Sequence, residues 1–420
     1  MAERRLNRLI AYTAAGSSLE FFDFTIYALF SPYISQTFFP QSDHYAAMLD
    51  TFAVFALGYL ARPLGALFFG HLGDTRGRRN TVILTVGLMS LSTLAIGLLP
   101  GYAVLGIWAP VLLVLFRLLQ GISLGGEVTG AAVFVAEHLP PSNRGSGVAW
   151  IYAGVTSGNV IASLFGVVLG TWLSHQQMVS WGWRVPFIFG AVLGFISYRL
   201  RTVALESPVF RQALESAETT TVPLKILMLN HGRAVLKGIG ITALMASAIF
   251  TLLYMPAYFS HQLHMSAELG FRYSACNFLL LVASCIGFGY MSDRVGRRRL
   301  LIFGSGLMLI IGYPLFALLS EVGGSAIWLF SGLFAIMVGM VNASYACLLV
   351  ELFPTRVRYS GMSLSYNLAF AIFGGLSPLV NTWLQHIMGN AFSLWYLLAA
   401  SALLSLVAGL MTQEKLHQAL

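Results

Sequence analysis

The stretches GHLGDTRGRR at residues 70–79 and GYMSDRVGRR at residues 289–298 decide the fold of this chain. Each begins with glycine, has aspartate in its middle and ends in Gly-Arg-Arg, and each connects two long apolar runs. The two copies lie about half of the chain length apart. A second pattern, a glutamate followed at fixed spacing by an arginine, recurs at Glu137 and Arg144 and again at Glu351 and Arg358. Matched patterns at this separation predict two similar halves.

The composition places both halves in a membrane. The chain is 57% hydrophobic and only 10% charged, whereas soluble proteins average about 25% charged residues. We predict an all-α membrane protein of twelve transmembrane helices in two six-helix pseudo-repeats, each span roughly 20 residues long. The expected spans begin near Leu9, Leu49, Thr81, Ala109, Gly147, Trp183, Ala234, Leu269, Leu300, Ala326, Gly361 and Ser393. The predicted domains are an N-terminal bundle (1–200), a cytoplasmic linker (201–231) and a C-terminal bundle (232–420).

The distribution of charge predicts the topology. The net charge is +8, and the basic residues gather in alternate connections between the spans, which is the pattern of cytoplasmic loops. We therefore expect both termini in the cytoplasm and a multi-pass protein of the plasma membrane, with the lipid bilayer rather than nucleic acid as its partner. No phosphate-binding loop, catalytic triad or metal-binding cluster is present in the sequence. The expectation is that the chain is not an enzyme and uses no cofactor or metal.

The repeated loop has a chemistry that suits a gate. Its aspartate can face the positive N-terminal end of a neighbouring helix, and its arginines can pair with glutamates of the Glu137 and Glu351 type. Such contacts can break and reform as two halves rock, so we expect these residues to control the conformation. The predicted gating residues are Asp74, Arg78, Glu137, Arg144, Asp293, Arg297, Glu351 and Arg358.

Longer stretches show a family resemblance. They include EFFDFTIY at residues 20–27, RLLQGISLGGE at residues 117–127 and ELFPTRVRYSGMSLSYNLAFAIFGGLSP at residues 351–378. Together they resemble the metabolite:proton symporter branch of the major facilitator superfamily, which contains proline/betaine, shikimate, citrate and 2-oxoglutarate transporters. The resemblance implies a twelve-helix fold and uptake of a small solute driven by the proton gradient.

Charges inside the predicted spans point to proton coupling, because intramembrane charges are costly and mark function by default. Asp23 and Arg117 fall at similar depth by helical rise, near or slightly outside mid-membrane, so we predict that they pair. A carboxylate beside arginine stays ionised, and one that loses this partner in a low-dielectric site takes a proton. Related sugar porters resemble this arrangement. Glu20 is an alternative proton carrier, and a permanent structural ion pair is the other interpretation of Asp23 and Arg117.

For Arg62 and Glu127, also at matched depth, we favour a buried structural pair.

Polar side chains on likely cavity faces are candidates for binding the substrate. They are Arg117, Gln120, Tyr27, Tyr254, Tyr258, Asn342 and Asn367. One mid-membrane arginine on such a face, opposite an aromatic and amide-rich wall, favours a zwitterion or monoanion such as proline or a betaine, because aromatic rings attract cationic nitrogen.

Three alternatives stay open at this point. One is a symporter of a di- or tricarboxylate or of a shikimate-like acid. Another is a proton-coupled exporter, although the proline-glycine signature common in span five of such exporters is absent. The third is a transport-inactive receptor, against which the intact loops and acids argue. We expect the protein to act as a monomer whose partners are a small-molecule substrate and protons.

Overall fold

The computed structural model describes residues 2–40, 43–76, 78–125, 127–203, 227, 230–261, 265–318, 324–389 and 392–414. Every regular element within these ranges is helical. The side chains of Glu20, Asp74, Arg78 and Glu127 lie outside the description, although the backbone of each belongs to a helix. The predicted linker falls almost entirely outside the described ranges.

Helices occupy all six spans predicted for the first half. In chain order they are α1 (Ala2–Leu29) with the short α2 (Ser31–Phe38), α3 (His44–Leu60) with α4 (Arg62–Arg76), α5 (Arg78–Leu98), α7 (Trp108–Leu124) with α8 (Glu127–His138), α9 (Arg144–Trp172) and α11 (Arg184–Val203).

The second half repeats this arrangement. Its helices are α14 (Gly232–His261), α15 (Ala267–Val295), α16 (Arg297–Ala317), α17 (Gly324–Leu352), α18 (Arg358–Ala369) with the π-helical turn η4 (Phe370–Gly375) and α19 (Ser377–Met388), and α20 (Phe392–Leu410). Ten helical stretches of the described chain are long and apolar enough to cross a membrane, and Ile83–Leu98 forms a shorter apolar helix. The predicted all-α membrane fold is therefore confirmed.

Proline and glycine explain why some spans consist of two helices. The break between α3 and α4 falls at Ala61 and places Pro63 in the first turn of α4, where the missing N–H of proline costs a helix least. Helix α7 ends before Gly125, and η4 ends in Gly374 and Gly375. The first of these breaks places Arg62 at the start of α4, within the apolar stretch Tyr45–Phe69.

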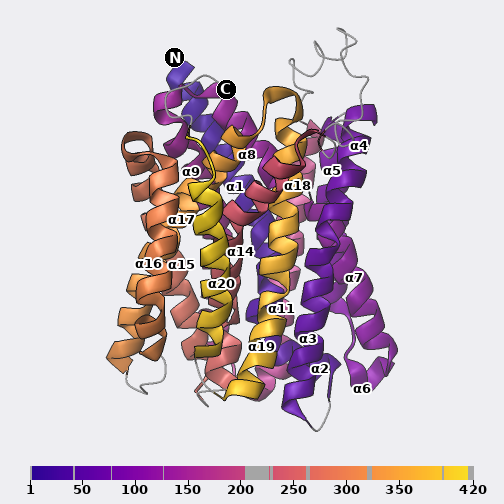
Figure 1. Ribbon diagram of the computed structural model, residues 1–420. Coiled ribbons are helices and arrows are strands. Elements are labelled where there is room, and N and C mark those ends of the chain that lie inside the picture. The colour runs from indigo at the N-terminus through magenta and orange to yellow at the C-terminus, as the bar shows by residue number, and fades with distance from the viewer. Residues whose placement is uncertain are drawn as a thin grey trace.

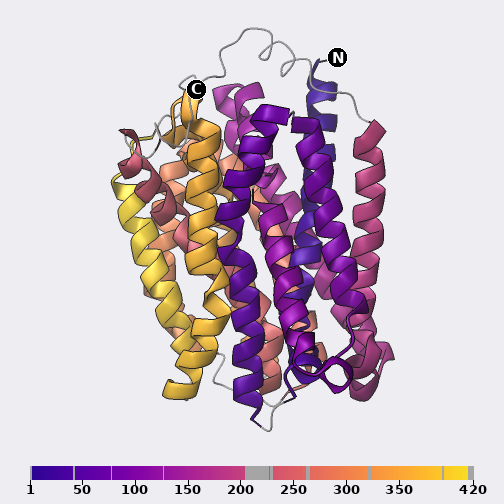
Figure 2. The same cartoon turned by 90° about the vertical axis from the view of Figure 1, so that its right-hand side faces the viewer.

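The helices run roughly parallel to one axis, and both ends of the chain lie at the same end of the bundle (Figures 1 and 2). We call this the inner end and the opposite one the outer end; the charge pattern predicts that the inner end faces the cytoplasm. The two halves meet along α9 and α15, and also where α1 contacts α14, α3 contacts α19 and α8 contacts α18.

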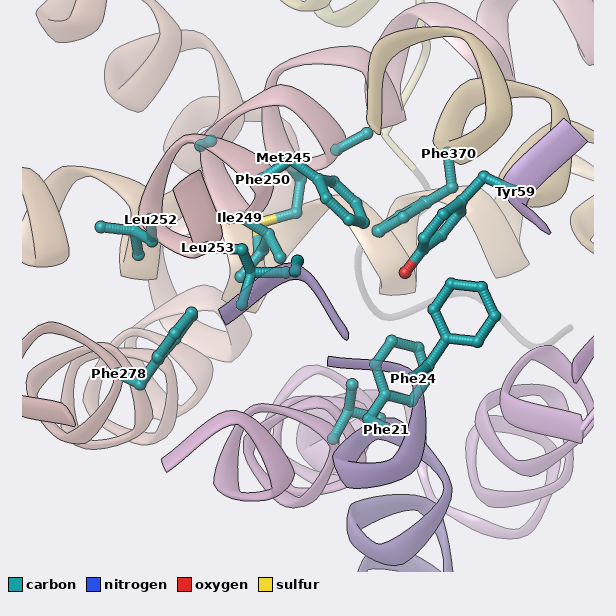
Figure 3. Packing of buried hydrophobic residues seen from close by; sticks show 14 of the residues in the cluster. Phe21, Phe24, Tyr59, Met245, Ile249, Phe250, Leu252, Leu253, Phe278 and Phe370 are labelled. Atoms are coloured by element: carbon teal, nitrogen blue, oxygen red, sulfur yellow. The ribbon is translucent and has the colours of Figure 1, made fainter. Parts of the chain in front are cut away.

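Aromatic rings fill part of the space between the halves. The Tyr59 ring of α3 lies 4.5 Å from Phe24 and 4.7 Å from Phe250 between centroids. Phe370 follows on the side of the second half, 6.2 Å from Phe250. Figure 3 shows these four rings gathered at one place, where elements of both halves converge. All four residues are buried, so their side chains fill the space between the halves at this level.

Candidate functional site

Six of the eight residues predicted to control a gate have described side chains, and all six lie together at the inner end. Asp293, at the end of α15, accepts hydrogen bonds from the backbone N–H groups of Gly145 at 2.7 Å and Ser146 at 2.9 Å. These groups belong to the first turn of α9, so the aspartate faces the positive end of a helix from the other half. The prediction for this loop aspartate is confirmed. The side chains of its counterpart Asp74 and of Arg78 lie outside the described residues.

Glu351 lies between two arginines. Arg297 of the loop approaches it at 2.8 Å and Arg144 of the first half at 3.2 Å, and Arg297 also pairs with Asp293 at 2.9 Å. All four side chains are buried. Pairing of the loop arginine with Glu351 is as predicted. Because a buried charge without a partner is costly, each member of this network depends on the others.

A second ion pair crosses between the halves nearby. Arg358 of the second half contacts Glu137 of the first at 2.5 Å. The repeated glutamates and arginines are thus exchanged: Arg144 pairs with Glu351, and Arg358 with Glu137. We call these four residues, together with Asp293 and Arg297, the inner latch. Sequence reasoning found all of its members but did not predict the exchange.

Asp23 and Arg117 do not form the predicted ion pair. Instead, a chain of hydrogen bonds joins them. Arg117 Nη1 donates to Gln120 at 2.8 Å, Gln120 Nε2 donates to the Thr93 hydroxyl at 2.8 Å, and that hydroxyl lies 3.5 Å from Asp23 Oδ2. Asp23 Oδ1 has no hydrogen-bond partner within the described chain. The two residues share a depth, as predicted, but Thr93 and Gln120 separate them. Thr93 was missed because an uncharged threonine in an apolar helix gives no signal.

Aromatic rings hold the other side of Arg117. Its guanidinium carbon lies 4.2 Å from the Phe24 ring centroid, 4.3 Å from Tyr27 and 5.3 Å from Phe55. These contacts favour the cation by roughly 0.5–2 kcal/mol each, which explains why it can point away from Asp23. Nε and Nη2 have no hydrogen-bond partner among the described residues. Every one of these neighbours belongs to the first half, so Arg117 lies inside one bundle.

Arg62, by contrast, lies between the halves. Its guanidinium carbon is 5.0 Å from the Tyr59 ring and 5.9 Å from Phe21 in the first half, and 5.6 Å from Tyr366 and 5.8 Å from Phe370 in the second. Nε and Nη1 have no hydrogen-bond partner in the described chain. The predicted structural pair with Glu127 falls on a side chain outside the description, so it stays a prediction.

The remaining substrate candidates are buried, and several touch the opposite half. Asn367 donates to the Gly125 carbonyl at 2.6 Å, and Asn342 donates to the Thr156 hydroxyl at 3.4 Å. Tyr254 packs on Phe52 with 5.3 Å between ring centroids. The Tyr27 hydroxyl donates to the Thr51 carbonyl at 3.1 Å, and Tyr258 is 2% exposed. Asn342, Asn367 and Tyr254 therefore lie at the boundary between the halves.

The outer end is closed as well, by rings instead of charges. Phe30 lies 5.0 Å from Phe271 between centroids, and the Tyr33 ring stacks on the same residue at 6.4 Å. Tyr45 stacks on His386 at 3.9 Å. With the inner latch formed too, the structure holds the halves together at both ends.

Comparisons with known proteins agree with this architecture. The family model described as Major Facilitator Superfamily matches residues 13–378. The chain is 35% identical to the glycine betaine/proline/ectoine/pipecolic acid transporter OusA of Dickeya dadantii, covering 99% of this chain and 85% of the relative. It is 38% identical to the inner membrane metabolite transport protein YhjE of Escherichia coli, covering 99% and 96%.

Solved structures show the same fold. The proton:xylose symporter XylE bound to 6-bromo-6-deoxy-D-glucose superposes with a TM-score of 0.78 at 16% identity, covering 100% of this chain and 98% of that one. A partially occluded inward-open form of XylE from E. coli gives a TM-score of 0.75 at 16% identity, covering 98% of each chain.

Proposed function

Because this chain belongs to the major facilitator superfamily, in its metabolite:proton symporter branch, we propose that it imports a small zwitterionic solute with protons by alternating access. The chain is a multi-pass membrane transporter. The proposal places it in a bacterial inner membrane as a monomer, with both termini in the cytoplasm. The proton gradient, and no cofactor, supplies the energy. Relatives named for proline and glycine betaine transport support the zwitterion.

The inner latch supports alternating access. Arg144–Glu351, Arg358–Glu137 and the hydrogen bonds from α9 to Asp293 all join one half to the other. They can exist only while the inner end is closed. Opening this end must break all of these contacts together. The inner end should therefore switch between a closed and an open state, with no stable intermediate degree of opening.

The surroundings of Asp23 are the observation that best supports proton coupling. It is a 3% exposed carboxyl group with no cation at ion-pair distance in the described chain, and it is joined to Arg117 only through Thr93 and Gln120. A buried carboxylate without a partner costs several kcal/mol unless a proton neutralises it. We infer that the closed structure holds the protonated acid. After the proton leaves, the free Nε and Nη2 of Arg117 supply the partner that the carboxylate then needs.

Transport into proteoliposomes tests the proposal. Labelled proline or glycine betaine should accumulate only with an inward proton gradient, and excess citrate, 2-oxoglutarate or shikimate should compete poorly. Asp23→Asn should abolish accumulation but permit counterflow, because the polar contact survives while the proton site is lost. Accumulation of a tricarboxylate with no zwitterion would refute the substrate class. Gradient-driven accumulation by Asp23→Asn would show that Asp23 is not the proton carrier and move the role to Glu20.

A further inference from the structure

We propose that the carboxylate of the transported zwitterion binds between the halves on Arg62, Tyr152 and Tyr345, and not on Arg117. This inference rests on the proposed function and places its solute. We call the residues concerned the Arg62 cluster: Arg62 and Tyr152 from the first half, and Asn342, Tyr345 and Tyr366 from the second.

Four members of the cluster, Arg62, Tyr152, Tyr345 and Tyr366, are linked by ring contacts across the boundary between the halves, and Asn342 lies one helical turn before Tyr345 on α17. Tyr152 of α9 contacts Tyr345 of α17 at 5.2 Å and Tyr366 of α18 at 6.3 Å between ring centroids. The guanidinium carbon of Arg62 lies 5.6 Å from the Tyr366 ring. Since the cluster draws on both halves, a ligand held there touches both, which alternating access requires of a substrate site.

Five polar atoms of the cluster are buried and lack a hydrogen-bond partner among the described residues. Arg62 Nε and Nη1, the hydroxyls of Tyr152 and Tyr345, and Asn342 Oδ1 have no hydrogen-bond partner within the described chain. Each of these side chains is at most 2% exposed. Buried polar groups are nearly always paired in native structures, so a concentration of unpaired ones at one place indicates a group that the described residues do not supply.

The chemistry of these atoms selects an anion. Two N–H groups of a guanidinium and two phenol hydroxyls are hydrogen-bond donors, and Arg62 has no ion-pair partner among the described carboxylates. Described aromatic rings surround the guanidinium, whereas the side chain of Glu127, its predicted partner, lies outside the described residues. A carboxylate ligand would give this buried cation a charged partner of the kind that stabilises it. One carboxylate would satisfy the charge and the donors together. A second carboxylate would find the described arginines of the inner latch, Arg144, Arg297 and Arg358, already paired with glutamate or aspartate.

Rings beside the cluster, together with its own Tyr366, can hold the cationic end of a zwitterion. The rings of Tyr59, Tyr366 and Phe370 surround Arg62 in the closed structure. Once a carboxylate neutralises the arginine, these ring faces are free to receive an ammonium group, which aromatic faces attract. Arg117 fits the role less well, because its neighbours all belong to the first half and Gln120 already occupies one of its nitrogens.

A matched pair of ligands separates this site from the alternative. Glycine betaine and choline share the trimethylammonium group, but only betaine carries a carboxylate. Both are used as competitors of labelled glycine betaine in counterflow, which needs no proton gradient. We expect wild type to prefer betaine by about 10- to 100-fold, the amount that a charge-assisted hydrogen bond contributes. Arg62→Gln should lose most of that preference, and Tyr152→Phe or Tyr345→Phe should weaken betaine by about 3- to 10-fold and leave choline unchanged.

Arg117→Gln is the control, and it should keep the preference. The inference is wrong if Arg117→Gln removes the preference while Arg62→Gln keeps it, or if wild type binds choline as well as betaine. If Arg62→Gln does not fold, the two tyrosine variants decide, and an unchanged betaine affinity in both overturns the site. If the wild-type protein does not exchange betaine, the proposal that the substrate is a zwitterion is also refuted. Betaine exchange with an unaltered preference in Arg62→Gln overturns only the inference.

Discussion

Replacing Arg144 by glutamine tests the inner latch directly. The arginine lies 3.2 Å from Glu351, and both side chains are 3% exposed. Glu351 keeps Arg297 at 2.8 Å in the variant, so no isolated charge is left behind. Arg144 Nε also donates to the Ala136 carbonyl at 3.2 Å, but that bond lies within the first half. The loss between the halves is the buried charge-assisted bond to Glu351, about 1.5–3 kcal/mol. Because this bond joins the halves, the whole loss falls on the closed state. The ratio of inward-open to closed molecules should rise about 10- to 150-fold.

Glu137→Gln provides the comparison. Glu137 is 36% exposed where it meets Arg358, and an amide oxygen can still accept from the guanidinium. Partly exposed pairs contribute about 1 kcal/mol or less, so the same ratio should change by at most about fivefold. Arg144→Lys retains the charge and should lie closer to wild type than Arg144→Gln does.

A native cysteine, Cys285, can report how often the inner end opens. Cys285 is buried on α15, 3.6 Å from the Ala149 carbonyl of α9, on a contact between the halves that must separate when the inner end opens. With Cys276 and Cys347 replaced by alanine, the rate of maleimide labelling of Cys285 follows the open population. The reasoning fails if Arg144→Gln labels no faster than wild type, or if Glu137→Gln accelerates labelling equally.

Three further predictions concern coupling, packing and topology. Thr93→Val removes the hydroxyl between Gln120 and Asp23 but keeps the shape, so the accumulation ratio in proteoliposomes should fall while counterflow persists; unchanged accumulation would remove Thr93 from the coupling site. Gly158→Ala places a methyl group against the Ser18 backbone and should lower the thermal unfolding midpoint by a few degrees, whereas Gly287→Ala, which meets open space, should leave it unchanged. Single cysteines within residues 71–80, 140–144 and 209–225 should react only with reagents on the cytoplasmic side, and labelling from outside would overturn the orientation.

The sequence was informative wherever a single helix or a local motif decides the structure. Apolar length predicted the spans, and the loop motif predicted that Asp293 would face a helix N-terminus, because both depend on residues close together in the chain. Depth was also predictable, since each residue adds a fixed rise along a helix. Asp23 and Arg117 indeed share a level of the bundle.

The sequence did not predict in which direction around its helix axis each side chain points in the folded protein. We predicted that Asp23 and Arg117 pair because they lie at equal depth. In the structure the rings of Phe24 and Tyr27 contact the Arg117 guanidinium, and Thr93 lies beside the Asp23 carboxylate. In the same way, the spacing of Glu137 and Arg144 repeats in both halves, yet nothing in one half tells how the other is placed against it. The surroundings of Arg62 could not be predicted either, because the rings around it come from four separate elements of both halves.

The exchanged pairs of the inner latch have the pattern of a two-fold symmetric dimer. Glu137 corresponds to Glu351 and Arg144 to Arg358, and each glutamate binds the arginine of the other half. In such an isologous contact a single glutamate and a single arginine per unit complete both bonds. Two copies of one six-helix chain, not joined by any linker, would therefore already possess the charges needed to close this end. The covalent connection keeps the two halves close to each other, but it supplies no residue that the exchanged pairs need.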